Sequence, residues 1–556
     1  MQGDFSRDSF EPQRGFSRVL SQQGRLTLDA DLNELQSIQL HLLRTLARDL
    51  IGPDGGEGFL VDSTTTPVAR NFAITKGRYY VDGFLCENRG EVFYQGNGAS
   101  TRPRQPYFRV TPQSDLELGN DSQHLVLLDV WERHVSFAET DGRLEMDRRY
   151  PPLLREVALG GPDTASRAQV VWQVKTDELR EKDRGVVLTT SRVILPQGQS
   201  HQLTATRIGA GTPAPTWTSN NVAVASVTNT GVVNGVSVGT AVITVQAGAG
   251  ITDTTTIEVV AAGGAIHVDE KTPAELRKQV LAILRWEERL DMWEPSACGS
   301  LRADAGSAVE DPKEPCIVAP KARYRGIENQ LYRVEVHNGG TVGKATFKWS
   351  RENASVVFGV SSIAGNVIKL SNWWRDARLG IGRGDLVEVL DDDVTLHQKA
   401  TPLCRVVDVD QDARTVTLDA TPDVKGDDPG KHTIIRRWDH RGSAGKSSDH
   451  GTLEADRALR IEESNTDWIA LEDGVRVQFV PATAPAVHVY QTGGYWLIPA
   501  RTALADVVWH RDGGAPVLEP PRGIDHHFAP LAIVAVDGAG KVERLFDLRR
   551  LIPAIT

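Results

Sequence analysis

The sequence predicts a mainly β, multi-domain protein, with a short-stranded antiparallel β-body, an N-terminal amphipathic helix and an inserted β-sandwich. Three observations predict this class. Glycine (51 residues) and proline (28 residues) recur throughout the chain, so turns are frequent. Apolar and polar residues alternate in short runs, which is the period of a half-buried strand. Long helical patterns are few, and 556 residues are too many for one hydrophobic core.

The composition is that of an ordinary globular protein, with 40% hydrophobic and 24% charged residues. A net charge of −11 and the lack of any basic run argue against nucleic-acid binding. No apolar stretch is long enough to span a bilayer, so we expect no membrane insertion. The first residues, MQGDFSRDSFEPQRGF, lack a positive region followed by an apolar core. We therefore expect no secretory signal and synthesis in the cytoplasm.

Residues 1–60 are predicted to form an extended arm followed by an assembly helix. The arm, up to Gly24, has no apolar period of its own. Its apolar side chains include Phe5, Phe10 and Phe16, and the arm itself offers no way to bury them. Because several large apolar side chains left in water are costly, we expect the arm to lie on a neighbouring subunit.

The helix is predicted to begin at Asp31, a cap that Glu34 would complete as a capping box, and to end at Gly52-Pro53. Its apolar stripe consists of Leu32, Leu35, Ile38, Leu42, Leu46 and Ile51, widened by Leu28, Leu43 and Leu50. So broad a stripe needs a partner surface, either the chain's own β-domain or the same helix of another subunit. We expect Leu35, Leu42 and Leu46, together with the phenylalanines of the arm, to form an interface between subunits.

Residues 61–185 are predicted to form the first part of the β-body. The segment FAITKGRYYVDGFLCEN alternates around Lys76-Gly77 and again around Asp82-Gly83, which predicts a hairpin. Two later apolar runs are too short for helices of this type and are rich in valine and tryptophan. They are predicted to be buried strands, at 124–137 and 167–176.

Residues 186–262 are predicted to form a separate domain. Short alternating strands recur there with turn residues about every eight to twelve positions, which is typical of a β-sandwich. The motifs are Leu195–Gly198, Leu203–Ala205, Trp217–Asn220, Val224–Val227, Gly231–Val233 and Gly239–Val245. Together they resemble the bacterial immunoglobulin-like (group 2) domain. Because strand-like sequence lies on both sides, we interpret this segment as an insertion.

Residues 263–556 are predicted to complete the β-body jointly with residues 61–185. A linking helix is expected near 272–293, where Thr272 is a plausible cap and Glu275 would complete a capping box. The remainder consists of short strand-like segments without an internal repeat, which disfavours a solenoid or a propeller.

Three clusters of carboxylates or imidazoles invite a metal interpretation, and a structural one is favoured for each. Asp391–Asp393 lacks the alternating ligands and the turn glycine of a calcium loop, so we interpret it as a solvated hairpin tip. The carboxylates of Asp408–Asp412 alternate, but the segment reads as the turn of a hairpin. His526-His527 lacks the helical partner that a zinc hydrolase requires. We therefore expect no metal, no cofactor and no catalytic residue.

Tryptophan and cysteine leave two further candidates. Most of the 12 tryptophans sit inside apolar alternations and are expected in the core. Trp373-Trp374 is the exception, because a tandem pair exposes at least one face, and it is a candidate contact for a partner or a glycan. Cys298 and Cys316 are the only plausible disulfide pair, and both are expected to be reduced in the cytoplasm.

A polar stretch rich in glycine and serine carries His432, Asp439, His440, Asp449 and His450. It looks like a mobile loop. Catalysis there would need a nucleophile and an orienting partner, and the sequence names neither.

Further motifs cover nearly the whole chain outside the insert. They are Gly3–Arg7, Gln22–Arg25, Leu28–Glu34, Gly77–Gly83, Leu128–Arg133, Arg155–Thr164, Tyr324–Arg333, Phe347–Arg351 and His526–Ala532. These motifs resemble a bacterial family of unassigned function that is encoded beside contractile injection system and phage-tail genes. The opening motifs also look like the start of some tailed-phage baseplate and fibre proteins, in which an N-terminal helix helps to bring subunits together.

The resemblance implies a structural subunit of a contractile injection system or phage-tail-like particle, at the baseplate or in a peripheral fibre. Its partners would be other particle subunits, copies of itself and, through the insert, a cell-surface ligand. A trimer fits the fibre-like resemblance best, with a dimer as the next alternative. The competing interpretation is a carbohydrate-binding or carbohydrate-active β-protein, in which the acidic clusters and Trp373-Trp374 line a groove.

Overall fold

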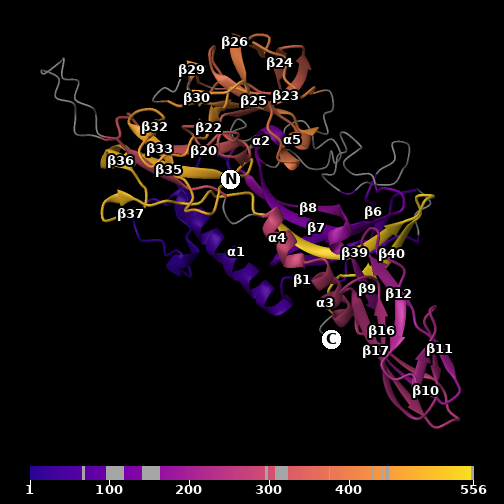
Figure 1. The fold of residues 1–556 in the computed structure, drawn as a ribbon. Helices are drawn as coiled ribbons and strands as arrows, with labels where there is room; N and C mark the ends of the chain where they lie inside the picture. Colours follow the sequence, from indigo (N-terminus) through magenta and orange to yellow (C-terminus); the bar gives the residue numbers. More distant parts are fainter. Residues whose placement is uncertain are drawn as a thin grey trace, which may run out of the picture. The chain divides into compact units, whose positions relative to one another are not determined.

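The computed structural model of the chain is mainly β, as predicted (Figure 1). The structure describes residues 1–64, 69–95, 105, 118–140, 154, 163–294, 298–306, 323–374, 376–426, 431–440, 443–444 and 450–552. The chain forms two compact units. The first unit comprises Met1–Leu42, Glu132–Gln169 and Pro295–Asp525, and the second comprises Leu43–Trp131, Val170–Glu294 and His526–Thr556.

The N-terminal helix α1 spans Asp29–Ile51 and ends where predicted, at Gly52. Its start differs from the prediction, because Asp31 lies inside the first turn and does not cap the helix. The Glu34 carboxylate accepts a hydrogen bond from the Ser9 hydroxyl at 2.7 Å. The Asp29 carboxylate likewise accepts one from the Ser6 amide at 2.8 Å. The arm therefore binds carboxylates of the first turns of α1, among them Glu34, which the sequence predicted to complete a capping box with Asp31.

A four-stranded sheet lies at the centre of the second unit, in the order β40-β39-β7-β8. Its strands are β7 (Ser122–Val135), β8 (Arg167–Glu178), β39 (His527–Val536) and β40 (Val542–Asp547). Both faces are buried, which explains the nearly continuous apolar run in β7. On one face Val126, Leu128 and Val130 pack with Phe59 and Trp172. On the other face Leu125 and Leu127 pack against the helical segment, at Val280 and Leu284.

The predicted hairpin turn at Asp82-Gly83 is confirmed. It joins β4 (Gly77–Val81) to β5 (Phe84–Asn88), and φ is +47° at Asp82 and +82° at Gly83, as a two-residue turn of type I′ requires. The alternation around Lys76-Gly77 is no second hairpin, because there the chain passes from one sheet to another. The sheets are β1-β4-β5 and β2-β3-β6, with β1 at Asp54–Gly56, β2 at Val61–Asp62, β3 at Ala73–Ile74 and β6 at Val92–Phe93.

The helix expected near 272–293 is two helices, α3 (Pro273–Ile283) and α4 (Trp286–Trp293). The predicted capping box of Thr272 and Glu275 is present at the start of α3. The chain breaks at Arg285, which adopts a left-handed conformation with φ at +51°. The buried Arg289 side chain donates from Nε to the Leu284 carbonyl at 2.9 Å. This bond satisfies a carbonyl that a continuous helix would have paired internally.

The insert is a β-sandwich with its own core, which includes Val193, Leu195, Ile243 and Ile257. Its sheets are ordered β13-β16-β17-β10-β18, β11-β15-β14 and β12-β9. The strands are β9 (Gly185–Leu188), β10 (Thr190–Pro196), β11 (Ser200–Gln202), β12 (Ala205–Ile208), β13 (Thr216–Ser219), β14 (Ala225–Val227), β15 (Val232–Gly235), β16 (Gly239–Gln246), β17 (Thr252–Val260) and β18 (His267–Glu270). Thr190 pairs with Glu270, so the chain enters and leaves this domain on neighbouring strands.

A seven-stranded sheet organises the first unit, in the order β29-β30-β31-β22-β20-β35-β36. Its strands are β20 (Gln330–Asn338), β22 (Thr346–Ser350), β29 (Ser443–Ala444), β30 (Thr452–Leu453), β31 (Leu459–Arg460), β35 (Tyr495–Arg501) and β36 (Asp506–Val507). A smaller sheet, β19-β33-β32, shares its core, with β19 at Leu301–Ala305, β32 at Ile469–Ala470 and β33 at Val475–Phe479. Phe347, Trp349 and Trp496 are at most 2% exposed in this core.

The first unit also contains a closed antiparallel barrel, which the sequence did not distinguish from the rest of the body. Its strands run β23-β24-β27-β26-β25-β28 around the barrel. They are β23 (Val357–Ala364), β24 (Val367–Leu370), β25 (Leu386–Leu390), β26 (Cys404–Asp410), β27 (Thr415–Leu418) and β28 (Ile434–Trp438). Phe358, Ile368, Val387 and Ile435 fill the interior.

Candidate functional site

Helix α1 carries an exposed apolar surface, which we call the leucine face. It consists of Leu32, Leu35, Leu42, Leu43, Leu46 and Leu50. All but the half-buried Leu35 have exposed fractions between 51% and 76%. At about 100° per residue these six side chains fall within an arc of roughly 100°. A different side attaches the helix to the chain, through Ala30 and Ile38, each 1% exposed.

The arm packs on its own chain at Phe5 and Phe10, whereas we expected these side chains to lie on a neighbouring subunit. The Phe5 ring lies edge-on to His134 with centroids 6.5 Å apart, and the Phe10 ring lies 5.8 Å from that of His41. Both phenylalanines are half-buried, whereas Phe16 is 55% exposed. The first ten residues therefore have partners within the first unit, and Phe16 remains on the surface.

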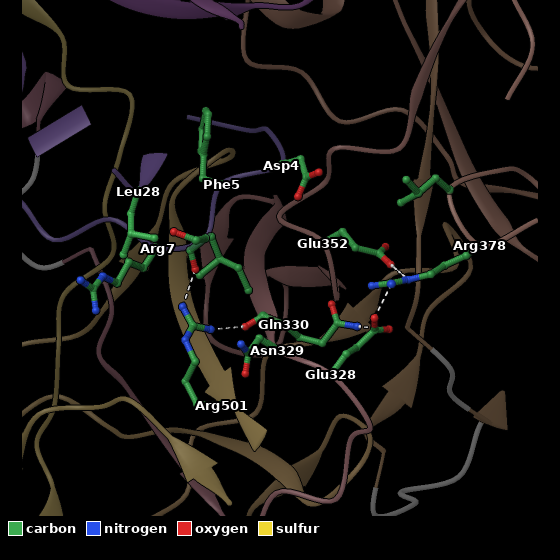
Figure 2. A pocket seen from close by; sticks show the side chains of 13 residues that line it. Asp4, Phe5, Arg7, Leu28, Glu328, Asn329, Gln330, Glu352, Arg378 and Arg501 are labelled. Atoms are coloured by element: carbon green, nitrogen blue, oxygen red, sulfur yellow. Dashed lines mark hydrogen bonds and ion pairs between the residues drawn. The ribbon is translucent and has the colours of Figure 1, made fainter. Parts of the chain in front are cut away.

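A pocket of about 500 Å³ lies in the first unit beside the arm (Figure 2). Its lining comes from the arm, from the start of β20, from the residues after β22, from the segment after β24 and from the end of β35. The lining residues are Asp4, Phe5, Ser6, Arg7, Leu28, Glu328, Asn329, Gln330, Leu331, Glu352, Arg378, Leu379 and Arg501. Sequence reasoning missed this site, because the segments that line it are far apart in the chain.

Glu352 is the buried charged group of the pocket, with 7% exposure. Its Oε2 accepts a hydrogen bond from Arg437 Nη2 at 2.8 Å, while Oε1 has no hydrogen-bond donor and lies 3.6 Å from Arg378 Nε. Burial, reinforced by the nearby Asp439 carboxylate, raises the pKa of Glu352 to about 7. This carboxyl group therefore changes protonation near neutral pH.

Arg437 fixes the frame of the pocket. Its Nη1 donates to the carbonyl oxygens of Arg378 at 2.7 Å and Gly380 at 2.6 Å, in the segment after β24. On the arm side, Arg501 donates to the Ser6 carbonyl at 2.5 Å and to the Gln330 carbonyl at 3.1 Å. The guanidinium groups of Arg437 and Arg501 thus hold two parts of the pocket wall through backbone carbonyls.

The sequence also missed a buried polar network between the seven-stranded sheet and the barrel. Lys348 Nζ lies 2.8 and 2.6 Å from the two carboxylate oxygens of Glu388, which also accepts from Trp438 Nε1 at 2.9 Å. His337 lies beside this carboxylate, at 3.6 Å, and neither of its ring nitrogens has a hydrogen-bond partner. Burial, followed by the charge of Lys348, lowers the pKa of His337 to about 3.

Two further histidines of the first unit are buried in the neutral form. Burial and the neighbouring Arg436 lower the pKa of His134 to about 3, and burial lowers that of His440 to about 4. His440 is 2% exposed and its Nε2 lies 2.8 Å from the Arg457 carbonyl. The stretch from His432 to His440 is therefore no mobile loop, since it includes β28, whereas Asp449 lies outside the described residues.

Asp391–Asp393 is not a solvated hairpin tip. Asp391 caps the short helix α5 (Asp392–Leu396) by accepting from the Val394 amide at 3.0 Å. Asp392 is 7% exposed and pairs with Arg133 at 3.1 Å and His432 at 2.6 Å. Asp392 is buried because Arg133 and His432, both distant in sequence, pair with its carboxylate.

The other two clusters lie as the structural interpretation predicted. Asp408–Asp412 runs along the end of β26 into the turn before β27. His526 and His527 point to different carboxylates, Asp129 at 2.7 Å and Asp82 at 3.0 Å. Among the residues that the structure describes, no three His, Cys, Asp or Glu side chains form a group that could hold a metal ion.

Trp373 and Trp374 stack on each other, with ring centroids 3.8 Å apart and planes at 23°. Both are half-buried and pack on the barrel core, where Trp374 also contacts Phe358. Protein atoms therefore cover the ring faces that stack on each other and those that pack on the barrel core. Of the candidate disulfide pair, Cys316 lies outside the described residues, so that pairing stays a prediction.

Two family models match the chain. The family of unknown function DUF6519 matches residues 1–192 and 222–545, and the bacterial Ig-like domain (group 2) matches residues 184–259. No curated protein matches. None of the helices within the described ranges has the length and hydropathy to cross a membrane.

Solved structures with local likeness include intimin of EHEC O157:H7, at 24% identity over 22% of this chain and 69% of that one, with a TM-score of 0.11. Domains 4 and 5 of the S-layer protein SbsC match at 18% identity over 37% of this chain and 94% of that one, with a TM-score of 0.13. The protocadherin GammaB4 extracellular domain matches at 10% identity and a TM-score of 0.13, over 17% of this chain and only 19% of its own length. TM-scores this low support no conclusion about the whole chain.

Proposed function

The chain belongs to the family of unknown function DUF6519 and carries a bacterial Ig-like domain, and from this premise we propose that it is a structural assembly subunit that catalyses no reaction. The particle we propose for it is a contractile injection system or a phage-tail-like particle, at the baseplate or in a peripheral fibre. The resemblance of its motifs to a family encoded beside such genes supports this placement.

The leucine face is the observation that carries the proposal. Five of its leucines are more than half exposed on a single helical stripe. Burying a leucine contributes about 1.5–3 kcal/mol, so burying the exposed part of these five would contribute roughly 6 kcal/mol per helix. An exposed apolar stripe of this kind marks a protein interaction site. We infer that the same helix of other subunits covers it, in a trimer or, as the next alternative, a dimer.

Sedimentation at micromolar concentration tests the self-association. The wild-type protein should sediment as one defined oligomer. Leu42→Lys, Leu43→Lys and Leu46→Lys together should yield folded monomers, because these side chains are exposed in the single chain and their loss leaves the core intact. Leu504→Lys is the matched control, since Leu504 is 64% exposed outside α1. A wild-type monomer, or an oligomer that survives the triple substitution, would contradict assembly through α1.

The placement in a particle has its own test. Particles purified from producing cells on a density gradient should carry the protein at a fixed ratio to their sheath subunit, and immunogold electron microscopy should label one end or the fibres. A protein that stays at the top of the gradient while particles sediment would refute the placement, but not the self-association.

A further inference from the structure

The pocket beside the arm has the chemistry of a ligand site distinct from the leucine face. We propose that it binds a neutral saccharide of one or two sugar units, recognised through hydroxyl groups. This goes beyond the assembly role and does not depend on it, because none of the six leucines of the leucine face lines the pocket.

The first observation is a buried carboxylate oxygen of Glu352 that has no hydrogen-bond donor. Glu352 is 7% exposed and lines the pocket, and its enclosed Oε1 has no hydrogen-bond donor, its nearest cation being Arg378 Nε at 3.6 Å. A buried carboxylate oxygen without a donor costs free energy, which a ligand O–H or N–H would recover. Arg437 donates to the other carboxylate oxygen, Oε2, and is itself held by the Gly380 carbonyl in the segment after β24, so the carboxylate is preorganised.

The second observation is the charge of the lining. The pocket has three carboxyl groups (Asp4, Glu328 and Glu352) and three guanidinium groups (Arg7, Arg378 and Arg501), whose charges balance when Glu352 is ionised. Arg378 pairs with Glu328, and Arg501 donates to backbone carbonyls, while Arg7 and Asp4 of the arm carry opposite charges, so the lining presents no net positive charge to an anionic ligand. A cationic ligand would compete with Arg378 for the same carboxylates. A neutral ligand disturbs none of these pairs.

The third observation is that the pocket lining combines a polar amide with apolar side chains. Asn329 accepts from Thr502 through Oδ1, which leaves its amide nitrogen as a donor at the pocket. Leu331 and Leu379 supply apolar surface beside these polar groups. Hydroxyl groups both donate and accept, and the C–H faces of a sugar are apolar, so a saccharide satisfies both kinds of wall. A volume of about 500 Å³ is within the usual range of small-molecule sites.

Titration calorimetry and saturation-transfer NMR of the full chain test the inference with defined probes. The neutral probes are maltose, lactose, cellobiose, mannose and N-acetylglucosamine, and the charged comparators are glucuronate and glucosamine. At least one neutral probe should bind more tightly than either comparator. Leu379→Trp should weaken that binding at least tenfold by filling the pocket, whereas Leu518→Trp should leave it unchanged. The two leucines are 40% and 43% exposed, so neither substitution should disturb the core.

Glu352→Gln should also weaken binding at least tenfold, and Leu379→Trp decides the matter if that variant fails to fold. The inference is overturned if no neutral probe binds at tens of millimolar. It is equally overturned if a charged comparator binds more tightly than every neutral probe, or if Leu379→Trp binds like the wild type.

Discussion

Acid should destabilise the first unit, because three of its histidines are buried without charge. The pKa values of His134, His337 and His440 fall from 6.5 to about 3, 3 and 4. Each folded pKa is depressed, so the unfolded chain binds protons first as the pH falls below 6.5. The stability they contribute is therefore present above pH 6.5 and is lost progressively towards the folded pKa.

The magnitude follows from linkage. Between pH 7 and pH 5 each neutral histidine should cost about 2 kcal/mol of unfolding free energy, or about 6 kcal/mol for the three. Glu352 acts in the opposite direction, because its folded pKa is raised from 4.5 to about 7. The folded state then takes up that proton first, which returns about 2 kcal/mol over the same interval. The buried N-terminal amine, whose pKa falls from 8.0 to about 5, adds a loss of about 2 kcal/mol, so the net loss is about 6 kcal/mol, a large part of the stability of an ordinary domain.

Urea unfolding followed by tryptophan fluorescence at pH 7 and pH 5 measures this loss. His134→Asn with His440→Asn should remove about 4 kcal/mol of the difference between the two pH values, whatever its effect at pH 7. His510→Asn, at an exposed position, should leave the difference unchanged. A wild-type difference below about 1 kcal/mol, or a double variant that keeps the full difference, would refute the reasoning.

Three further outcomes are expected. Gly83→Ala should lower the unfolding free energy by several kcal/mol in denaturant titration, since φ is +82° and a Cβ would lie 2.3 Å from the Arg44 carbonyl oxygen. The control Gly513→Ala, at φ +54° with open space around it, should lower the unfolding free energy by only about 1 kcal/mol. Ile208→Ala should cost about 2–5 kcal/mol by the same measurement, because this fully buried side chain joins the insert to the core of the second unit. Gln39→Leu should tighten self-association or change the number of subunits in sedimentation. A polar residue within an apolar stripe lowers the affinity between helices and specifies how many helices associate. Unchanged sedimentation would place Gln39 outside the interface.

Features that depend on neighbouring residues were predictable from the sequence. The end of α1 at Gly52 and the turn at Asp82-Gly83 each follow from backbone conformations that glycine adopts readily. The capping box of Thr272 and Glu275 needed only residues three positions apart. Local chemistry is sufficient for features of this kind.

Features that join distant segments were not predictable. The sequence predicted that Asp392 is solvated, because its partner Arg133 lies 259 positions earlier in the chain. Lys348 meets Glu388 across 40 positions, and the sequence gives no sign that either charge is buried. The pocket needs the arm and four later segments together, and only the folded chain makes Glu352 part of its lining. Periodicity reports which side chains are apolar, but it does not report which strands pair.

The closed barrel limits how neighbours can attach to the first unit. Every barrel strand has both backbone edges paired, so none can accept an added strand from another chain. In the seven-stranded sheet, the outermost strands that the structure describes, β29 and β36, are two residues long each. Such short edges give an incoming strand few hydrogen bonds. Attachment by backbone pairing is thus discouraged at the barrel and at the ends of the seven-stranded sheet, which favours side-chain contacts such as those we propose for α1.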